Sequence, residues 1–297
     1  MAELKCKRPV LRYLGGKWRL ASWIISYFPQ HNIYVEPFGG AASVLLKKPR
    51  SYAEVYNDLD AEIVNVFRVL QDTKKAKKLI RSLELTLFAR QEFEDCWKLQ
   101  QKTILDKTLC LLRPRRPDIE KARCTIIKSF MGFSSDSCVR KYRMGFRNAN
   151  RKSGTFAADD WRRYPVALSV CVERFRGVLI ENKPAIEVME MYDSPETLFY
   201  LDPPYVQSTR KHGIYRHEMS DVDHLQLGEV AKKAKGMVIV SGYNSELYGE
   251  IYRGWHEIRK SAVAMAGMRM GSKYTTEILW LSPNCKKSLP LFAGIEY

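Results

Sequence analysis

The 297-residue chain has few residues of the kinds that bind metals or form disulfide frameworks. It contains five histidines and seven cysteines, and no two cysteines form a Cys-x-x-Cys pair. Because closely spaced Cys and His ligands are lacking, we predict no zinc site and no other metal. The odd number of cysteines disfavours a secreted disulfide framework and favours a reducing compartment, the cytoplasm.

The sequence also lacks a long apolar segment. No apolar run approaches the roughly 20 residues that a membrane-spanning helix requires. Residues 1–16 carry early positive charge, but no continuous apolar stretch follows it. We therefore expect neither a membrane partner nor a secretory signal.

Acidic residues are outnumbered, and the excess of basic residues is the most informative feature of the composition. The chain has 49 Lys and Arg against 33 Asp and Glu, a net charge of +16 and an isoelectric point near 9.5. Between residues 113 and 163 there are 14 basic and 5 acidic residues, so more than half of the net charge lies in about one sixth of the chain. Concentrated positive charge favours nucleic acid as the partner, since phosphate neutralisation drives affinity through counterion release. A generally cationic surface is the alternative.

Apolar patterns divide the chain into three regions. Residues 8–70 alternate strand-like and helix-like patterns, and residues 166–297 return to the same alternation. The part between them looks helical in its first half and is basic in its second. We therefore predict an α/β fold whose sheet is built from residues 1–72 and 166–297, with residues 73–165 inserted as a mostly helical domain.

The sharpest motif is Asp202-Pro203-Pro204-Tyr205, directly after the apolar strand pattern of residues 198–201. Open α/β sheets bind ligands at the carboxyl ends of their strands. Two prolines hold the chain extended and leave their carbonyls as acceptors. A carboxylate, a fixed carbonyl and an aromatic ring suit the exocyclic amino group of a planar base. The alternative interpretation is a proline-rich turn without function.

A second motif, Glu36 followed by Gly39 and Gly40, comes directly after the strand pattern of residues 33–35. Glycines at such a turn let the backbone approach a ligand closely. The pattern is neither a G-x-G-x-x-G fingerprint nor a Walker motif, so NAD and ATP fit less well, and Glu36 is a candidate partner for an ammonium group. A tight turn between a strand and a helix is the alternative.

Two further positions suggest polar contacts with a ligand. Asp58 follows the next strand pattern about 20 residues beyond the glycines, where an acidic residue commonly holds a ribose hydroxyl pair, whereas Asp60 is predicted to cap the next helix. The pair Gly15-Gly16 precedes Lys17 at a helix start, an arrangement that favours a carboxylate or phosphate. A capped helix start explains this last motif equally well.

Together these segments resemble the Dam-type DNA adenine-N6 methyltransferases. The Tyr-x-Gly-Gly-Lys start, the Glu-Pro-Phe-Gly-Gly turn, the Asn-Asp pair and Asp-Pro-Pro-Tyr occur in that family's order, over about residues 10–70 and 170–285. Residues 240–244 and 276–280 also look like family segments. The resemblance implies a Rossmann-like methyltransferase sheet, S-adenosylmethionine as cofactor, double-stranded DNA as partner, and the basic insert as the target-recognition domain.

The resemblance also implies a role for individual residues. It implies a cofactor pocket formed by Tyr13, Gly15, Gly16, Lys17, Glu36, Pro37, Phe38, Gly39, Gly40, Ser43, Asp58 and Asp202. It implies that the target adenine is held by Asp202, Pro203, Pro204 and Tyr205. The predicted DNA contacts are Arg140, Lys141, Arg143, Arg147, Asn148, Asn150, Arg151 and Lys152. The implied chemistry is direct methyl transfer to a flipped-out adenine, without a covalent enzyme intermediate.

One departure from the family bears on DNA specificity. Relatives that read GATC carry a pattern like Gly-x-Phe-Asn-Val-Pro at the end of a basic hairpin, and here Gly154 and Phe156 fit but residues 157–159 do not. GATC specificity is therefore not expected. Two other functions stay open: a cytosine-N4 or RNA amino methyltransferase, and a non-catalytic DNA-binding protein. We expect a cytoplasmic protein of bacterial or phage origin, monomeric or dimeric on DNA.

Overall fold

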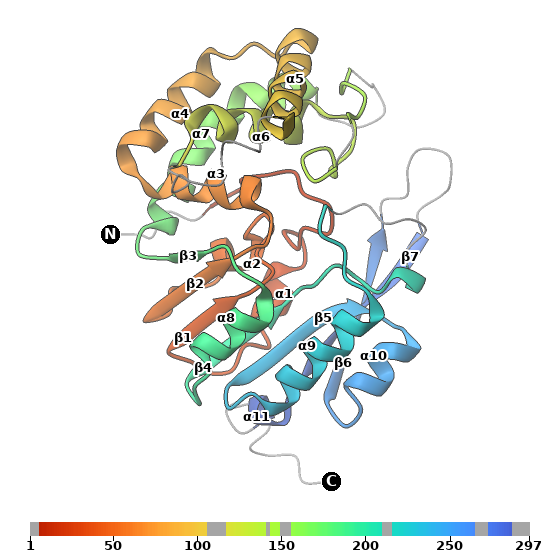
Figure 1. The fold of residues 1–297 in the computed structure, drawn as a ribbon. Coiled ribbons are helices and arrows are strands. Elements are labelled where there is room, and N and C mark those ends of the chain that lie inside the picture. The colour runs from red at the N-terminus through yellow and green to blue at the C-terminus, as the bar shows by residue number, and fades with distance from the viewer. Residues whose placement is uncertain are drawn as a thin grey trace.

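A mixed sheet with helices on both faces forms one end of the molecule, and a cluster of helices forms the other (Figure 1). The computed structural model describes residues 6–105, 117–140, 143–148, 156–209, 216–264 and 273–286. The sheet takes strands from both the first and the third region of the sequence. The predicted α/β fold is therefore confirmed.

Seven strands form this sheet within the described residues. They are β1 (Ile33–Glu36), β2 (Ala53–Asn57), β3 (Leu179–Glu181), β4 (Thr197–Leu201), β5 (Met237–Tyr243), β6 (His256–Ala264) and β7 (Lys273–Leu281). Their spatial order is β3-β2-β1-β4-β5-β7-β6, with β1 to β5 parallel and β7 antiparallel to both of its neighbours. Strands β1, β4 and β5 are mostly apolar and almost entirely buried, as expected for parallel strands whose two faces are covered by helices.

The order of the strands reverses between β1 and β4. These strands pair in parallel, with Tyr34 opposite Leu198 and Val35 opposite Phe199. From β1 the chain proceeds outward to β2 and β3, whereas from β4 it proceeds to β5 on the other side. Ligands of open α/β sheets bind in the crevice outside the carboxyl ends of the strands at such a reversal. The Gly-Gly turn follows β1 and Asp-Pro-Pro-Tyr follows β4, so the fold brings the two sharpest motifs to this crevice.

Helices complete a layered arrangement around the sheet. One face is covered by α8 (Ala185–Tyr192), α9 (Asp221–Lys233) and α10 (Glu246–Ile251), whose apolar residues share a core with Val35, Phe199 and Val240. The other face is covered by α1 (Ala21–Ile25) and α2 (Ser43–Lys47), and the short helix α11 (Pro283–Lys286) follows β7. None of the described helices is long and apolar enough to cross a membrane.

The helical cluster comprises α3 (Ala61–Gln71), α4 (Thr73–Leu85), α5 (Arg90–Leu105), α6 (Ile119–Met131) and α7 (Ala157–Phe175) (Figure 1). It shares a core with the sheet. Phe67 of α3 stacks on Phe175 of α7 with ring centroids 4.6 Å apart, and it lies equally close to the ring of Tyr56 on β2. The domain division at residues 72/73 and 165/166 stays a prediction, and its second boundary falls inside α7.

Two elements differ from the simplest expectation from the sequence. The spacing of Trp18, Ile24, Ile25 and Phe28 predicts an amphipathic helix that ends at Pro29, but the regular helix is confined to α1. Strand β6 was not predicted from its sequence. Strand β6 lies at the edge of the sheet and begins His-Glu-Ile-Arg-Lys-Ser, so charged residues interrupt the apolar pattern. Charged side chains are tolerated there because an edge strand faces solvent on one side.

Candidate active site

A cavity of about 450 Å³ opens at the carboxyl ends of β1, β2 and β4. Its volume is typical of small-molecule sites. All of the residues that the sequence assigned to the cofactor and to the target base line it: Tyr13, Gly15, Gly16, Lys17, Glu36, Pro37, Phe38, Gly39, Gly40, Ser43, Asp58, Asp202, Pro203, Pro204 and Tyr205. The structure therefore brings four separate sequence motifs into a single pocket.

The turn after β1 depends on its glycines. Gly40 has a φ of +47°, and a Cβ at this position would lie 2.9 Å from Cε1 of Tyr13. A Cβ on Gly39 would lie 2.1 Å from the ring of Tyr56. The buried Asn57 donates from Nδ2 to the Pro37 carbonyl at 2.8 Å and so fixes the turn against β2. The turn thus packs its backbone directly against two aromatic rings, which only glycine allows at these two positions.

Asp58 connects this turn to the start of α3. Its two carboxylate oxygens accept hydrogen bonds from the backbone N–H groups of Gly40 and Asp60, each at 2.8 Å. Burial raises the pKa of Asp58 to about 7, and the neighbouring Asp60 carboxylate adds to the effect. Asp60 accepts from the N–H of Glu62 at 2.9 Å, so its predicted role as the helix cap is confirmed.

Glu36 is a buried carboxyl group at the end of β1. Its Oε2 accepts hydrogen bonds from the Tyr34 hydroxyl and the Leu45 N–H, both at 3.1 Å. Burial raises the pKa of Glu36 to about 8. Close by, the Ser43 hydroxyl is buried, lines the same pocket, and has no hydrogen-bond partner among the described residues. Both groups would gain from a polar ligand.

Asp202 is held through one of its two oxygens. Its Oδ1 lies 2.8 Å from Nζ of Lys17 and also accepts a hydrogen bond of 2.8 Å from the Ser241 hydroxyl. The Tyr200 hydroxyl lies 3.0 Å from the same Ser241 oxygen and fixes it in turn. Oδ2 of Asp202 and the carbonyl of Pro203 have no donor among the described residues. The motif therefore presents two acceptors to the pocket, with the carboxylate already oriented.

Tyr205 is fixed by contacts with three residues. Its hydroxyl donates to Glu277 of β7, Nζ of Lys17 lies 4.7 Å from its ring centroid, and the ring of Tyr243 packs edge-on at 4.5 Å. Nζ of Lys17 also lies 3.6 Å from Glu277. Burial raises the pKa of Glu277, although the nearby Lys17 opposes this rise. We call Lys17, Asp202, Tyr205, Ser241 and Glu277 the Asp202 cluster.

Ser241, Glu277 and Arg216 were not assigned individually from the sequence, although each contacts or lines the pocket. The first two lie in segments 240–244 and 276–280, which had looked like family segments. A signal for Glu277 was available, because an acidic residue opening the apolar run Ile-Leu-Trp-Leu is unusual in a buried strand. Arg216 gave no such signal, since it is one of many basic residues.

The arginines predicted to contact DNA that the structure describes each lie beside a carboxylate. Arg140 forms a salt bridge of 2.6 Å with Asp136, Arg143 pairs with Glu94, and Arg147 lies 3.6 Å from Asp160. Asn148 is exposed. The remaining predicted DNA contacts lie outside the described residues: Lys141, Asn150, Arg151 and Lys152. The DNA-contact assignment stays a prediction.

The fold and the pocket together define a Rossmann-like methyltransferase. A model of the family described as D12 class N6 adenine-specific DNA methyltransferase matches residues 13–265, which is most of the chain. The chain therefore belongs to this family, and it is a DNA adenine-N6 methyltransferase that uses a methyl donor. The resemblance predicted from the motifs is confirmed, and the match also includes the basic segment between them.

Two relatives are similar to the chain at low identity. The type II methyltransferase M.MjaIII of Methanocaldococcus jannaschii is 23% identical over 271 residues, which cover 84% of this chain and 89% of that protein. The modification methylase StsI of Streptococcus sanguinis is 24% identical over 226 residues, or 71% of this chain. Those residues cover 30% of StsI, so the similarity extends over less than a third of that protein.

Proposed function

We propose that the methyl donor is S-adenosylmethionine and that the target adenine is flipped out of duplex DNA to meet Asp202. The observation that carries this proposal is the one-sided anchoring of Asp202, with Oδ1 held by Lys17 and Ser241 and Oδ2 directed at no donor in the described residues. An adenine amino group has two N–H donors. Oδ2 of Asp202 and the Pro203 carbonyl would accept one each.

The residues of the pocket fit the proposed cofactor. Five acidic residues and three basic residues line the cavity, Glu36, Asp58, Asp60, Asp202 and Glu218 against Lys17, Lys183 and Arg216, in a chain whose net charge is +16. Such a lining favours a cofactor with net positive charge, and S-adenosylmethionine carries a sulfonium, an ammonium and one carboxylate. Asp58 would hold the ribose hydroxyls, Glu36 the ammonium group, and the Ser43 hydroxyl a further polar atom. Bound there, S-adenosylmethionine would supply an electrophilic methyl group.

The protein's own residues would then orient the amine and take up its proton. Hydrogen bonds from N6 to Oδ2 of Asp202 and to the Pro203 carbonyl would draw the nitrogen lone pair out of conjugation with the ring, so that it can attack the methyl group. As the N–C bond forms, the bond from the methyl carbon to the sulfonium would break, with its electron pair left on sulfur. N6 would then carry one proton too many, which Oδ2 of Asp202 is positioned to accept. Tyr205 would stack on the base, and its hydroxyl bond to Glu277 keeps the ring in place. Fixed acceptors need no reorganisation during the reaction.

The basic segment, residues 113–163, would bind the phosphates of the DNA around the flipped base. Arg140 and Arg143 are held by carboxylates that a DNA phosphate can replace, since phosphates accept the same charge-assisted bonds. Such contacts would position the duplex without specifying its sequence. The names of the two relatives belong to restriction–modification, and we propose this role for the chain as well.

The test is methyl transfer by three variants, Asp202→Ala, Asp202→Asn and Asp193→Asn. Labelled S-adenosylmethionine and unmethylated DNA are incubated with each protein, and the product is digested to nucleosides. We expect N6-methyladenine from the parent chain and a loss of at least about a hundredfold in both Asp202 variants, comparable to losing one preorganised catalytic hydrogen bond. DNA affinity should stay within a few-fold, because the described basic side chains are unchanged.

Asp193→Asn is the matched control. Asp193 is also a carboxylate, but it accepts from the backbone N–H groups of Lys235 and Gly236 and does not line the pocket. It should keep full activity. Substantial activity in Asp202→Ala would contradict the assignment of Asp202. If the parent chain labels no DNA, the non-catalytic interpretation holds, and N4-methylcytosine as product would contradict the proposed target.

A further inference from the structure

A half-buried arginine outside the recognised motifs joins three parts of the molecule. The side chain of Arg216, which is 17% exposed, lies in the segment between Asp-Pro-Pro-Tyr and α9 and lines the pocket. Its guanidinium contacts Oδ1 of Asp60 at 2.9 Å, Oε2 of Glu62 at 3.2 Å and the carbonyl of Cys138 at 3.0 Å. We call these four residues and Lys128, which pairs with Glu62, the Arg216 network.

On the pocket side, this network continues into the proposed cofactor contacts. Asp60, the partner of Arg216, donates its backbone N–H to Asp58, and Asp58 in turn accepts from the N–H of Gly40. A single chain of hydrogen bonds thus runs from the glycine turn after β1 to the segment that follows Asp-Pro-Pro-Tyr. A displacement of the Arg216 guanidinium would therefore shift Asp60 and, through it, the carboxylate of Asp58, which we assign to the ribose.

On the other side, the network contacts the helical cluster. Cys138 precedes Val139, which lines the pocket, and Arg140, which is a predicted phosphate contact. Glu62 also pairs with Lys128 of α6 at 3.2 Å, and Nζ of Lys128 lies 5.2 Å from the ring centroid of Trp97 on α5. The two cations and two carboxylates of the network balance in charge. Removing one cation from such a partly buried set leaves a carboxylate without compensation.

We propose that Arg216 is a positioning residue for the methyl-transfer reaction, because it fixes the start of α3 and the Cys138 turn against the segment that follows Asp-Pro-Pro-Tyr. The inference rests on the proposed function, since it takes the pocket to be the S-adenosylmethionine site. Arg216 touches no reacting atom in this proposal. It acts through Asp60 and Asp58 on cofactor binding, and through Cys138 on the placement of the helical cluster.

The charge of Arg216 gives this role a measurable signature. The groups that face Asp58 and Asp60 are Arg216, Glu62 and His217, with Lys128 acting on Glu62. Arg216 lowers the pKa of Asp58, which burial has raised to about 7, so loss of the guanidinium should raise that pKa further. A protonated Asp58 is a poorer acceptor for ribose hydroxyls, so cofactor binding weakens as the pH falls through the pKa of Asp58. Without the guanidinium, this loss of binding on acidification would begin at a higher pH than in the parent chain.

The experiment measures binding of S-adenosylhomocysteine, which lacks the transferable methyl group, by calorimetry from about pH 5 to 9. The variants Arg216→Met and Arg216→Gln remove the charge, Arg216→Gln keeps a donor for the Cys138 carbonyl, and Arg216→Lys keeps the charge. We expect the charge-removing variants to bind about tenfold more weakly at pH 7. The acid limb of the binding profile, which is the pH range over which affinity is lost on acidification, should move upward by about one pH unit. Arg216→Lys should keep the pH profile of the parent chain.

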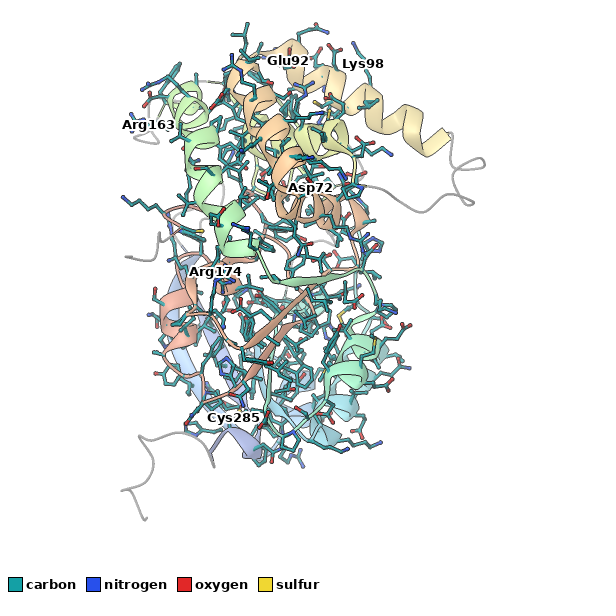
Figure 2. All side chains as sticks on the ribbon, turned by 90° about the vertical axis from the view of Figure 1, so that its left-hand side faces the viewer. Asp72, Glu92, Lys98, Arg163, Arg174 and Cys285 are labelled. Atoms are coloured by element: carbon teal, nitrogen blue, oxygen red, sulfur yellow. The ribbon has the colours of Figure 1, made fainter. Side chains whose placement is uncertain are left out.

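Arg123→Met is the matched control. The Arg123 side chain is also 17% exposed and pairs with two carboxylates, Glu92 and Glu120, and with the Thr86 hydroxyl. Glu92 lies at the end of the helical cluster far from the sheet (Figure 2), and Arg123 does not line the pocket. This variant should lose stability like Arg216→Met but keep the parent's pH profile of binding.

Each outcome of this experiment supports or overturns one specific claim. If the parent chain does not bind S-adenosylhomocysteine, the proposed function fails. If the parent binds but both charge-removing variants share its affinity and pH profile, the positioning role of Arg216 is wrong. That role is also wrong if Arg123→Met displaces the acid limb equally, because the effect would then reflect general destabilisation. Should Arg216→Met not fold, Arg216→Gln and Arg216→Lys still give the comparison.

Discussion

Replacing Lys17 with methionine tests the electrostatics of the Asp202 cluster most directly. Lys17 is 5% exposed and is the only cation that the described residues place within 4 Å of Asp202 or Glu277. Methionine keeps most of the apolar stem but removes the charge. The variant therefore leaves two carboxylates facing each other across a buried site, with only hydroxyl donors to stabilise them.

The magnitude follows from the distances. At an effective dielectric constant of about 20, unit charges 2.8 Å apart attract by about 6 kcal/mol and those 3.6 Å apart by about 5 kcal/mol. Most of this attraction offsets the cost of burying the ammonium group. Removing one partner of a buried pair typically costs about 3–5 kcal/mol. Because the Asp202 side chain is 18% exposed and partly screened by water, we expect the lower end, about 3 kcal/mol.

The assay is urea unfolding followed by the fluorescence of the six tryptophans, combined with a double-mutant cycle. Glu277→Gln should cost less than Lys17→Met, because burial already raises the pKa of Glu277 and disfavours its charge. In the double variant one charge of each sign is gone, so its loss of stability should fall short of the sum by at least about 1 kcal/mol. Lys17→Arg is the control that keeps the charge. An additive cycle, or a Lys17→Met variant within about 0.5 kcal/mol of the parent, would refute the reasoning.

Two further predictions concern the pocket. Since burial raises the pKa of Glu36 to about 8 and that of Asp58 to about 7, both hold protons part of the time near neutral pH. A cationic cofactor favours their ionised forms, so binding should release protons and strengthen as the pH rises from about 6 to 8. Calorimetry in buffers of different ionisation enthalpy checks this, and heats that do not depend on the buffer would contradict it. Gly40→Ala should lose about 1–2 kcal/mol of stability, because its φ is +47°, and should also bind cofactor more weakly, because the new Cβ would lie 2.9 Å from Tyr13. Gly254→Ala, with a φ of +85° and no heavy atom within 4 Å of its Cβ, should lose stability alone, and equal cofactor affinity in both variants would count against the crowding argument.

The sheet and the position of the pocket could be predicted because their signals are local. Strands end at Glu36, Asn57 and Leu201, and each is followed at once by a motif with polar or glycine residues. Parallel strands place such ends on one edge of the sheet. Because each motif directly follows a predicted strand, the sequence alone predicted that the motifs meet at this edge. The cap at Asp60 was predicted from its position just before the apolar pattern of α3.

The contacts within the pocket could not be predicted because they depend on the order of the strands in space. Glu277 reaches Tyr205 because β7 enters antiparallel between β5 and β6, and nothing in the sequence near Glu277 specifies that position. The pairing of Arg143 with Glu94 joins residues 49 positions apart. Composition shows that the segment is basic, but it does not show which of its charges are already neutralised by distant acidic residues.

The aromatic contact between Phe67, Phe175 and Tyr56 limits how this enzyme could be redirected to a new DNA site. Exchanging the helical cluster for that of a relative would be the obvious route. The junction of such a graft would lie within the apolar core that the helical cluster shares with the sheet, and not in a flexible linker. Foreign side chains would have to interlock with β2 as well as with one another. Successful chimeras should therefore retain α3 and the second half of α7 from the recipient and replace only the outer helices.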